Sequence, residues 1–139
     1  MRIFSKLDEM TGYVKELKEM LPDKEEYLQQ LIRRRACEKT IEVAIESLID
    51  VSAMIVSAER FGLPASEEGI FDILAEKMVI SRDFSDTLKN LKGFRNVLIH
   101  RYPHVADDMV YYYLTNYLDD FHVFKSTIKS YLEKQENSC

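Results

Sequence analysis

A short segment near residue 100 places an arginine, a histidine and a tyrosine immediately before a proline, in the run Arg95-Asn96-Val97-Leu98-Ile99-His100-Arg101-Tyr102-Pro103. An arginine guanidinium can hold a phosphate through two parallel hydrogen bonds. A histidine imidazole is the side chain best suited to moving protons near neutral pH. Arg95 and His100 are therefore the minimum set for metal-free cleavage of RNA, in which a 2′-hydroxyl attacks the neighbouring phosphate.

The spacing of Arg95 and His100 limits how they could act together. Five positions along an ideal helix correspond to a rotation of about 140°, so the two side chains would leave different faces. Asn96 and His100, four positions apart, would share one face. Two arrangements would bring Arg95 and His100 together: unwinding of the last helical turn before Pro103, or pairing of two copies of the chain through this helix. We favour the paired arrangement, with some unwinding contributing.

In such a shared cleft, His100 would accept the proton of the 2′-hydroxyl or donate a proton to the leaving 5′-oxygen. Arg95 would hold the phosphate and stabilise its developing charge, and Asn96 would orient the imidazole or donate a further hydrogen bond. We expect a 2′,3′-cyclic phosphate end, a 5′-hydroxyl end and no metal requirement. The plainer interpretation is that Arg95 and His100 belong to a solvated helix face or to a helix-end dipole interaction.

The composition indicates one helical globular domain spanning residues 1–139. The chain is long enough to bury roughly two thirds of its unfolded surface. With 4 glycines and 3 prolines among 139 residues, it favours long helices over a turn-rich β fold. No apolar run approaches the ~20 residues that span a membrane, and the N-terminus does not resemble a signal peptide. We therefore expect a cytoplasmic protein that binds no membrane.

The net charge of −5 argues against broad nucleic-acid binding, and we expect no binding to DNA. It leaves room for a small basic cleft on an acidic body. One group of positive charges is formed by Arg33–Arg35 with Lys39. A second group lies around the motif and consists of Lys89, Lys92, Arg95, Arg101 and His104.

Five amphipathic segments with helical spacing, and no competing strand pattern, predict an all-α antiparallel bundle of four or five helices. The first helix is expected to stop before Pro22. The second should start with Asp23 as its N-cap and run to about Ala58. Its length of about 35 residues predicts a bend or break near residues 33–40. Gly62 is the predicted cap at its C-terminal end.

The other three predicted helices include the one that carries the motif. Ser66 is expected to cap the third helix, in which Met78 is among the inward-facing side chains. Ser81 or Asp83 should cap the fourth, and the fifth should begin near Asp107. The apolar stripe of the fourth helix consists of Phe84, Leu88, Leu91, Phe94 and Leu98.

The possible metal and thiol chemistry of the chain has a simpler structural interpretation. Asp119-x-x-His122 resembles half of a di-iron motif, but the sequence offers no second half, so we expect no metal site and no cofactor. Two cysteines do not make a disulfide framework. Cys37 is expected to be a small buried side chain, and Cys139 belongs to a frayed end.

Three further groups of residues are candidate contacts for RNA. Tyr111–Tyr113 could stack on bases, although helical spacing requires one or two of them to pack in the core. The run Arg33–Arg35 is expected to form a solvated face, with guidance of RNA or a protein partner as the alternative. His104 is expected to be an exposed loop residue.

The motif segment resembles the Arg-x4-His-x-Tyr signature of HepT-type toxins, which belong to the HEPN superfamily (higher eukaryotes and prokaryotes nucleotide-binding domains). The resemblance covers roughly residues 30–132. It includes the Ala-Ile-Glu-Ser-Leu-Ile-Asp stretch at 44–50, the Gly-Leu-Pro loop at 62–64 and Phe71-x-x-Leu74. Asn96 and Tyr102 add to the specificity of the match.

The resemblance implies an all-helical homodimer whose motif helices meet across a cleft, acting as the ribonuclease of a type VII-like toxin–antitoxin pair. Arg95 and His100 match the family's catalytic pair, and Asn96 matches the polar residue that often follows the arginine. The implied partners are an RNA substrate and a nucleotidyltransferase antitoxin, which neutralises the toxin by transferring AMP to the motif tyrosine, here Tyr102. An adenylate would add negative charge and bulk beside the cleft and so repel an RNA backbone.

Two other functions stay open from the sequence. The chain could be a non-catalytic helical dimer whose cleft binds a nucleotide or a nucleotidyltransferase partner. It could also be a purely structural bundle, in which Arg95 and His100 would affect only stability. Cleavage of RNA in EDTA, lost on His100→Ala substitution, separates the ribonuclease from both alternatives.

Overall fold

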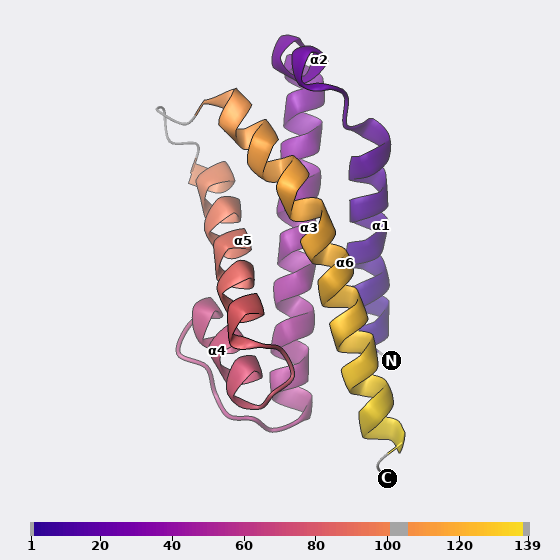
Figure 1. The fold of residues 1–139 in the computed structure, drawn as a ribbon, viewed down its shortest axis with the longest axis vertical. Coiled ribbons are helices and arrows are strands. Elements are labelled where there is room, and N and C mark those ends of the chain that lie inside the picture. Colours follow the sequence, from indigo (N-terminus) through magenta and orange to yellow (C-terminus); the bar gives the residue numbers. More distant parts are fainter. Residues whose placement is uncertain (1, 101–105, 138–139) are drawn as a thin grey trace.

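The computed structural model describes residues 2–100 and 106–137, which form six helices and confirm the predicted all-α antiparallel bundle (Figure 1). Four long helices run alternately in opposite directions, and two short helices lie in the connections between the first three of them. The bounds are α1 (Arg2–Met20), α2 (Lys24–Gln29), α3 (Leu31–Ala58), α4 (Glu67–Glu76), α5 (Arg82–His100) and α6 (Asp107–Asn137). Within the described ranges, no helix combines the length and the apolar character needed to cross a membrane.

α3 is the central helix of the bundle. It packs most extensively against α1 and also contacts α4 and α5, while α6 crosses the bundle and contacts α1, α2 and α5. Apolar side chains recurring every three or four residues make one continuous core between these helices. Its largest fully buried members are Leu7, Met10, Leu17, Tyr27, Ile41, Ile45, Leu48, Ile55, Phe71, Leu74, Phe121 and Phe124.

The chain breaks between α2 and α3 at Gln30, and the prediction of a break near residues 33–40 is wrong by a few positions. Gln30 adopts an extended conformation (φ −112°, ψ 95°), and its backbone N–H donates to the carbonyl of Glu26. Asp23 begins α2 as predicted, because its carboxylate accepts a hydrogen bond from the backbone N–H of Glu26.

Arg34 links the end of α2 to the start of α6. Its Nη1 donates to the carbonyl oxygens of Leu28 (2.6 Å) and Tyr27 (3.3 Å), and its Nε lies 3.5 Å from the carboxylate of Asp107. These contacts satisfy carbonyls that the end of a short helix leaves without intrahelical donors. The Arg34 side chain is only 14% exposed. The predicted solvated face over Arg33–Arg35 is therefore right for the two outer arginines and wrong for Arg34.

Two predicted features near the ends of α3 and α4 are also corrected. Glu59, and not Gly62, is the C-cap of α3, and Arg60 takes up the left-handed conformation (φ 56°) directly after it. Gly62 is still needed where it lies, because its φ of 116° strains any residue with a side chain. Met78 is 87% exposed instead of facing the core, since its φ of 62° turns the chain away after α4.

The caps that begin α4 and α5 are confirmed. The Ser66 hydroxyl accepts from the backbone N–H of Gly69, and the Ser81 hydroxyl accepts from that of Phe84, both at 3.1 Å. Asp83 is therefore not the cap of α5. The expected stripe of α5 is buried at Leu88, Leu91, Phe94 and Leu98 and half-buried at Phe84.

Tyr27 and Tyr111 form a ring contact between α2 and α6, with centroids 4.9 Å apart. The Tyr111 hydroxyl donates to the carbonyl of Pro22 at 2.8 Å. The Tyr27 hydroxyl is fully buried and has no hydrogen-bond partner in the described part of the chain. Burial raises the pKa of Tyr27 strongly. The two hydroxyls thus differ in whether their burial is compensated.

This difference predicts opposite effects of removing each oxygen. Tyr27→Phe should raise the free energy of unfolding by about 1 kcal/mol, because it removes an uncompensated buried hydroxyl. Tyr111→Phe should lower the free energy of unfolding by about 1 kcal/mol, because it leaves the partly buried carbonyl of Pro22 without its donor. Urea denaturation of both variants measures the difference. A loss of stability in Tyr27→Phe equal to that in Tyr111→Phe would contradict the assignment.

Candidate active site on α5

The motif residues Arg95, Asn96 and His100 all lie on α5, which is helical through His100. The expected contribution of unwinding in the last turn is therefore wrong as far as His100. Arg95 and His100 leave different flanks of α5, as the rotation of about 140° between them requires. Tyr102 and its neighbours Arg101, Pro103 and His104 lie outside the described residues, so their expected roles remain predictions.

Arg95 is directed from α5 toward the start of α4, where it meets Glu67. Its Nη2 donates to Glu67 Oε1 at 2.7 Å and its Nη1 donates to Oε2 at 3.4 Å. Nη2 also donates to the side-chain oxygen of Asn96 at 3.0 Å. The Arg95 side chain is 12% exposed, and its Nε is buried without a partner in the described chain. The guanidinium is therefore held in one orientation by two neighbouring residues.

The contact with Asn96 carries the tip of Arg95 to the flank of α5 that bears His100. Asn96 precedes His100 by four residues, so the two side chains lie on one face of the helix. His100 is exposed at the end of α5. Asn96 thus contacts the nearly buried Arg95 directly and shares its helix face with the exposed His100 one turn further on.

Three cations on α5 are paired with carboxylates on α4. Besides the Arg95 pair, Lys89 Nζ lies 2.6 Å from Asp72 and Lys92 Nζ lies 3.9 Å from Glu68. The hydrogen bond to Asp72 raises the pKa of Lys89. These carboxylates offset the positive charge that Lys89, Lys92 and Arg95 could bring to a basic cleft, while Arg101 and His104 of the same group lie outside the described residues.

Glu67 is the residue at this site that the sequence analysis missed. Two observations could have pointed to it: Glu67 directly follows the predicted cap Ser66, and the cations of α5 recur every three residues. The pairing itself depends on how α4 docks against α5, and helical periodicity does not report the angle between two helices.

A groove between α5 and α6 adjoins the motif flank. It has a volume of about 720 Å³, and its lining includes Gly93, Phe94 and Val97 of α5 and Tyr113 and Tyr117 of α6. The rings of Tyr113 and Tyr117 are stacked, with an interplanar angle of 21° and centroids 6.3 Å apart. The groove therefore exposes aromatic surface one to two helical turns before His100.

The three residues of the run Tyr111–Tyr113 differ in their exposure. Tyr111 packs against α2, whereas Tyr112 and Tyr113 are 63% and 40% exposed. The expectation that at least one of the three packs inside is confirmed by Tyr111. The alternative use of the run in stacking on bases stays a prediction for the two exposed rings.

The residues considered for metal or thiol chemistry lie away from this flank. His122 Nε2 contacts Lys18 Nζ between α6 and α1. Across residues 2–100 and 106–137, no three His, Cys, Asp or Glu side chains gather closely enough to hold a metal ion. Cys37 is fully buried, as expected, and burial raises the pKa of its thiol.

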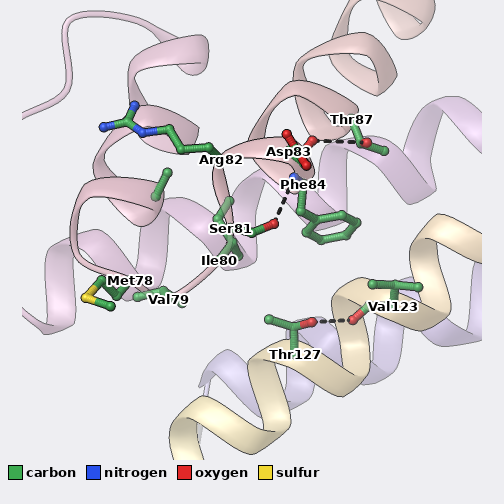
Figure 2. Close-up of a pocket in the computed structure, with 11 residues that line it drawn as sticks. Met78, Val79, Ile80, Ser81, Arg82, Asp83, Phe84, Thr87, Val123 and Thr127 are labelled. Atoms are coloured by element: carbon green, nitrogen blue, oxygen red, sulfur yellow. Dashed lines mark hydrogen bonds between the residues drawn. The ribbon is translucent and has the colours of Figure 1, made fainter.

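A pocket at the other end of α5 is a separate feature (Figure 2). It has a volume of about 750 Å³ and lies between the turn that precedes α5 and the α6 residues Val123 and Thr127. Its α5 residues, Arg82 to Thr87, belong to the first turns of the helix, whereas His100 ends it. Neither Arg95 nor His100 lines this pocket, so it has no part in the candidate site.

Comparison with known proteins gives relatives that span nearly the whole chain. The mRNA nuclease HepT of Shewanella oneidensis is 26% identical over 128 residues, which cover 92% of this chain and 96% of the relative. A solved structure of a tri-AMPylated Shewanella oneidensis HEPN toxin in complex with an MNT antitoxin matches with a TM-score of 0.85 at 26% identity, covering 92% of this chain and 96% of that chain.

YutE from Bacillus subtilis, a cytosolic protein of unknown function, shares the fold with a TM-score of 0.77 at 23% identity, over 94% of this chain and 91% of that chain. The family model described as Ribonuclease HepT-like matches residues 10–128. This match includes Arg95, Asn96, His100 and the helices that position them. The chain therefore belongs to the ribonuclease HepT-like family.

Proposed function

We propose that this chain is the ribonuclease of a toxin–antitoxin pair, with one HEPN-type domain over residues 1–139. Arg95 and His100 are its catalytic residues, and Asn96 supports them. The observation that carries the proposal is the course of Arg95, whose guanidinium reaches Asn96 on the flank of α5 that ends in His100. The named activity of the Shewanella relative, an mRNA nuclease, supports the same reaction class.

The proposed reaction needs no metal ion. A His100 imidazole accepts the proton of a 2′-hydroxyl while the 2′-oxygen forms a bond to the adjacent phosphorus. The bond from phosphorus to the 5′-oxygen breaks, and a protonated imidazole donates the proton that this oxygen takes up. The second Nη1 hydrogen of Arg95, which neither Glu67 nor Asn96 takes up, and the Asn96 amide donate hydrogen bonds to the phosphate oxygens, on which negative charge accumulates. The products are a 2′,3′-cyclic phosphate end and a 5′-hydroxyl end.

A homodimer formed through α5 would complete this site, since one copy presents a single imidazole. The groove beside α5 supports the proposal, because its exposed aromatic surface suits burial against a second copy. Gly93 supports it further: a Cβ atom added there would meet no atom within 4 Å. Glycine inside a helix costs about 1 kcal/mol relative to alanine, which a close approach of two helices would explain.

The proposed protein partner is a nucleotidyltransferase antitoxin that transfers AMP from ATP to Tyr102, a residue outside the described ranges. The bond would form between the tyrosine oxygen and the α-phosphorus, with diphosphate leaving. The Shewanella HEPN toxin, which is AMPylated and bound to its MNT antitoxin, supports this pairing. The alternative is a non-catalytic dimer that binds a nucleotide or the transferase. A chain that binds the transferase but cleaves no RNA would support this alternative.

The central test is cleavage of RNA in EDTA. His100→Ala should reduce the cleavage rate by about 10²- to 10⁴-fold, because it removes the proton acceptor. A substrate with a 2′-deoxy residue at the scissile position should stay intact, and so should DNA. Gel analysis of product ends measures the reaction, with circular dichroism to verify that the variant is folded. Equal cleavage by wild type and His100→Ala would exclude His100 from catalysis.

The dimer is tested by filling the space beside Gly93. Gly93→Leu should leave the monomer folded, because the site faces open space and leucine favours helix. It should shift the protein from dimer to monomer in sedimentation experiments and abolish cleavage. Gly93→Ala serves as the control with a smaller side chain. A Gly93→Leu protein that is still dimeric would contradict packing through this face of α5.

The antitoxin pairing is tested by mass. Incubation of the chain with its nucleotidyltransferase and ATP should add one or more AMP units, visible in the intact mass. Tyr102→Phe should remove the modification, since phenylalanine offers no oxygen to the α-phosphorus. Unchanged mass steps in Tyr102→Phe would assign the modification to another residue. The modified wild type should also lose RNA cleavage.

A further inference from the structure

Glu67 lies at the start of α4 and holds the guanidinium of Arg95 through both carboxylate oxygens. We propose that Glu67 is a positioning residue for the ribonuclease reaction: it fixes the direction of Arg95 and, through Arg95, that of the Asn96 amide. This inference rests on the function proposed above. Glu67 itself does not touch the substrate in this scheme.

The backbone of Glu67 is well placed for this task. Glu67 is the first residue of α4, directly after the Ser66 cap, and α4 is anchored by the buried side chains of Phe71 and Leu74. A carboxylate in the first turn is also favoured by the helix dipole. The acceptor for Arg95 is therefore carried by a docked helix and not by a mobile loop.

The hydrogen bonds leave the guanidinium little freedom. Glu67 accepts from Nη1 and Nη2, which form one edge of the group, and Asn96 accepts from the second hydrogen of Nη2. A planar fork with three such bonds cannot rotate about its terminal bonds without breaking them. The orientation that brings Arg95 toward the flank of His100 therefore depends on Glu67.

The constraint extends to Asn96. Because the Asn96 oxygen accepts from Arg95, its Nδ2 group is turned away and available as a donor; among the described residues, no acceptor takes up this group. Asn96 lies one turn before His100, where the phosphate would bind. Loss of Glu67 would release Arg95 and with it the direction of this donor.

The other pairs between α4 and α5 do not have this geometry. Lys92 and Glu68 approach only to 3.9 Å through single atoms, and Lys89 and Asp72 share one short contact. Glu68 lies in the same first turn as Glu67 and carries the same charge. Glu68→Gln is therefore a matched control for changes in charge and helix stability.

The experiment compares Glu67→Gln with Glu68→Gln. Cleavage by Glu67→Gln at saturating RNA should fall by about 10-fold or more, because a catalytic group that loses its alignment can lose up to ~10² in rate. Its affinity for a non-cleavable 2′-O-methyl RNA should be equal or higher, because one negative charge is gone. Because Glu68 also lines the groove between α5 and α6, Glu68→Gln is compared at a concentration at which sedimentation shows that it has the oligomeric state of wild type. It should then cleave within about 2-fold of wild type.

A double-mutant cycle separates positioning from a general structural effect. If Glu67 acts through Arg95, Glu67→Gln should cause no further loss of cleavage in an Arg95→Ala background. Glu67→Gln that cleaves as fast as Glu68→Gln would overturn the proposal. Faster cleavage than wild type would also overturn it, since it would mean that Glu67 competes with the phosphate for Arg95.

Nitrogen-15 NMR of the Arg95 side chain gives a readout independent of cleavage. Hindered rotation should give separate Nη signals in wild type and Glu68→Gln, and averaged signals in Glu67→Gln. Averaged signals in wild type would overturn the proposal. If wild type does not cleave RNA at all, the proposed ribonuclease function fails, and this comparison alone decides whether Glu67 holds Arg95.

Discussion

The regular geometry of α5 is the constraint on which the candidate site depends. A straight helix keeps residues five positions apart on different flanks, so Arg95 and His100 cannot meet by local structure alone. The length of the arginine side chain reduces the problem, because its guanidinium reaches Asn96 on the flank of His100. A lysine could not do the same, since a single ammonium has no planar fork to engage Glu67 and Asn96 together. A second copy of the chain would supply the second imidazole that a single copy lacks.

α4 couples the stability of the bundle to the order of this site. A guanidinium that is nearly buried needs a partner, because an unpaired charge in such a place is costly. Glu67 supplies that partner only while α4 stays docked on α5. The Arg95 Nε nevertheless has no acceptor among the described residues, so the pairing is incomplete.

The sequence predicted those features that a single helix determines. The stripe of α5, the caps Ser66 and Ser81 and the burial of Cys37 follow from local spacing and residue type, and all are confirmed. The proposed catalytic pair was also visible, because arginine and histidine at a fixed spacing in one segment need no tertiary information. Comparison with relatives confirms the family.

The predictions that failed concern contacts between helices or unusual backbone conformations. At the break near Gln30, Arg34 contacts a carbonyl of α2 and the carboxylate of Asp107 in α6. No periodic pattern in the sequence reports such contacts. Met78 follows the apolar spacing of α4 but comes after the helix has ended, in a left-handed conformation. The three ion pairs between α4 and α5 were missed for the same reason: the sequence shows the charges but not which helices face each other.

These three ion pairs also limit how strongly such a protein could attract RNA. RNA affinity arises largely from cations that neutralise phosphates, and three cations of α5 are already paired with α4. On an acidic body of net charge −5, the attraction for a phosphate backbone must then come from few groups near the motif. On the proposed function, this scarcity makes RNA binding sensitive to each adenylate that is added beside the motif. A single added negative charge removes a large share of a small electrostatic attraction for RNA. The same charge would change the attraction of a broad basic surface only slightly.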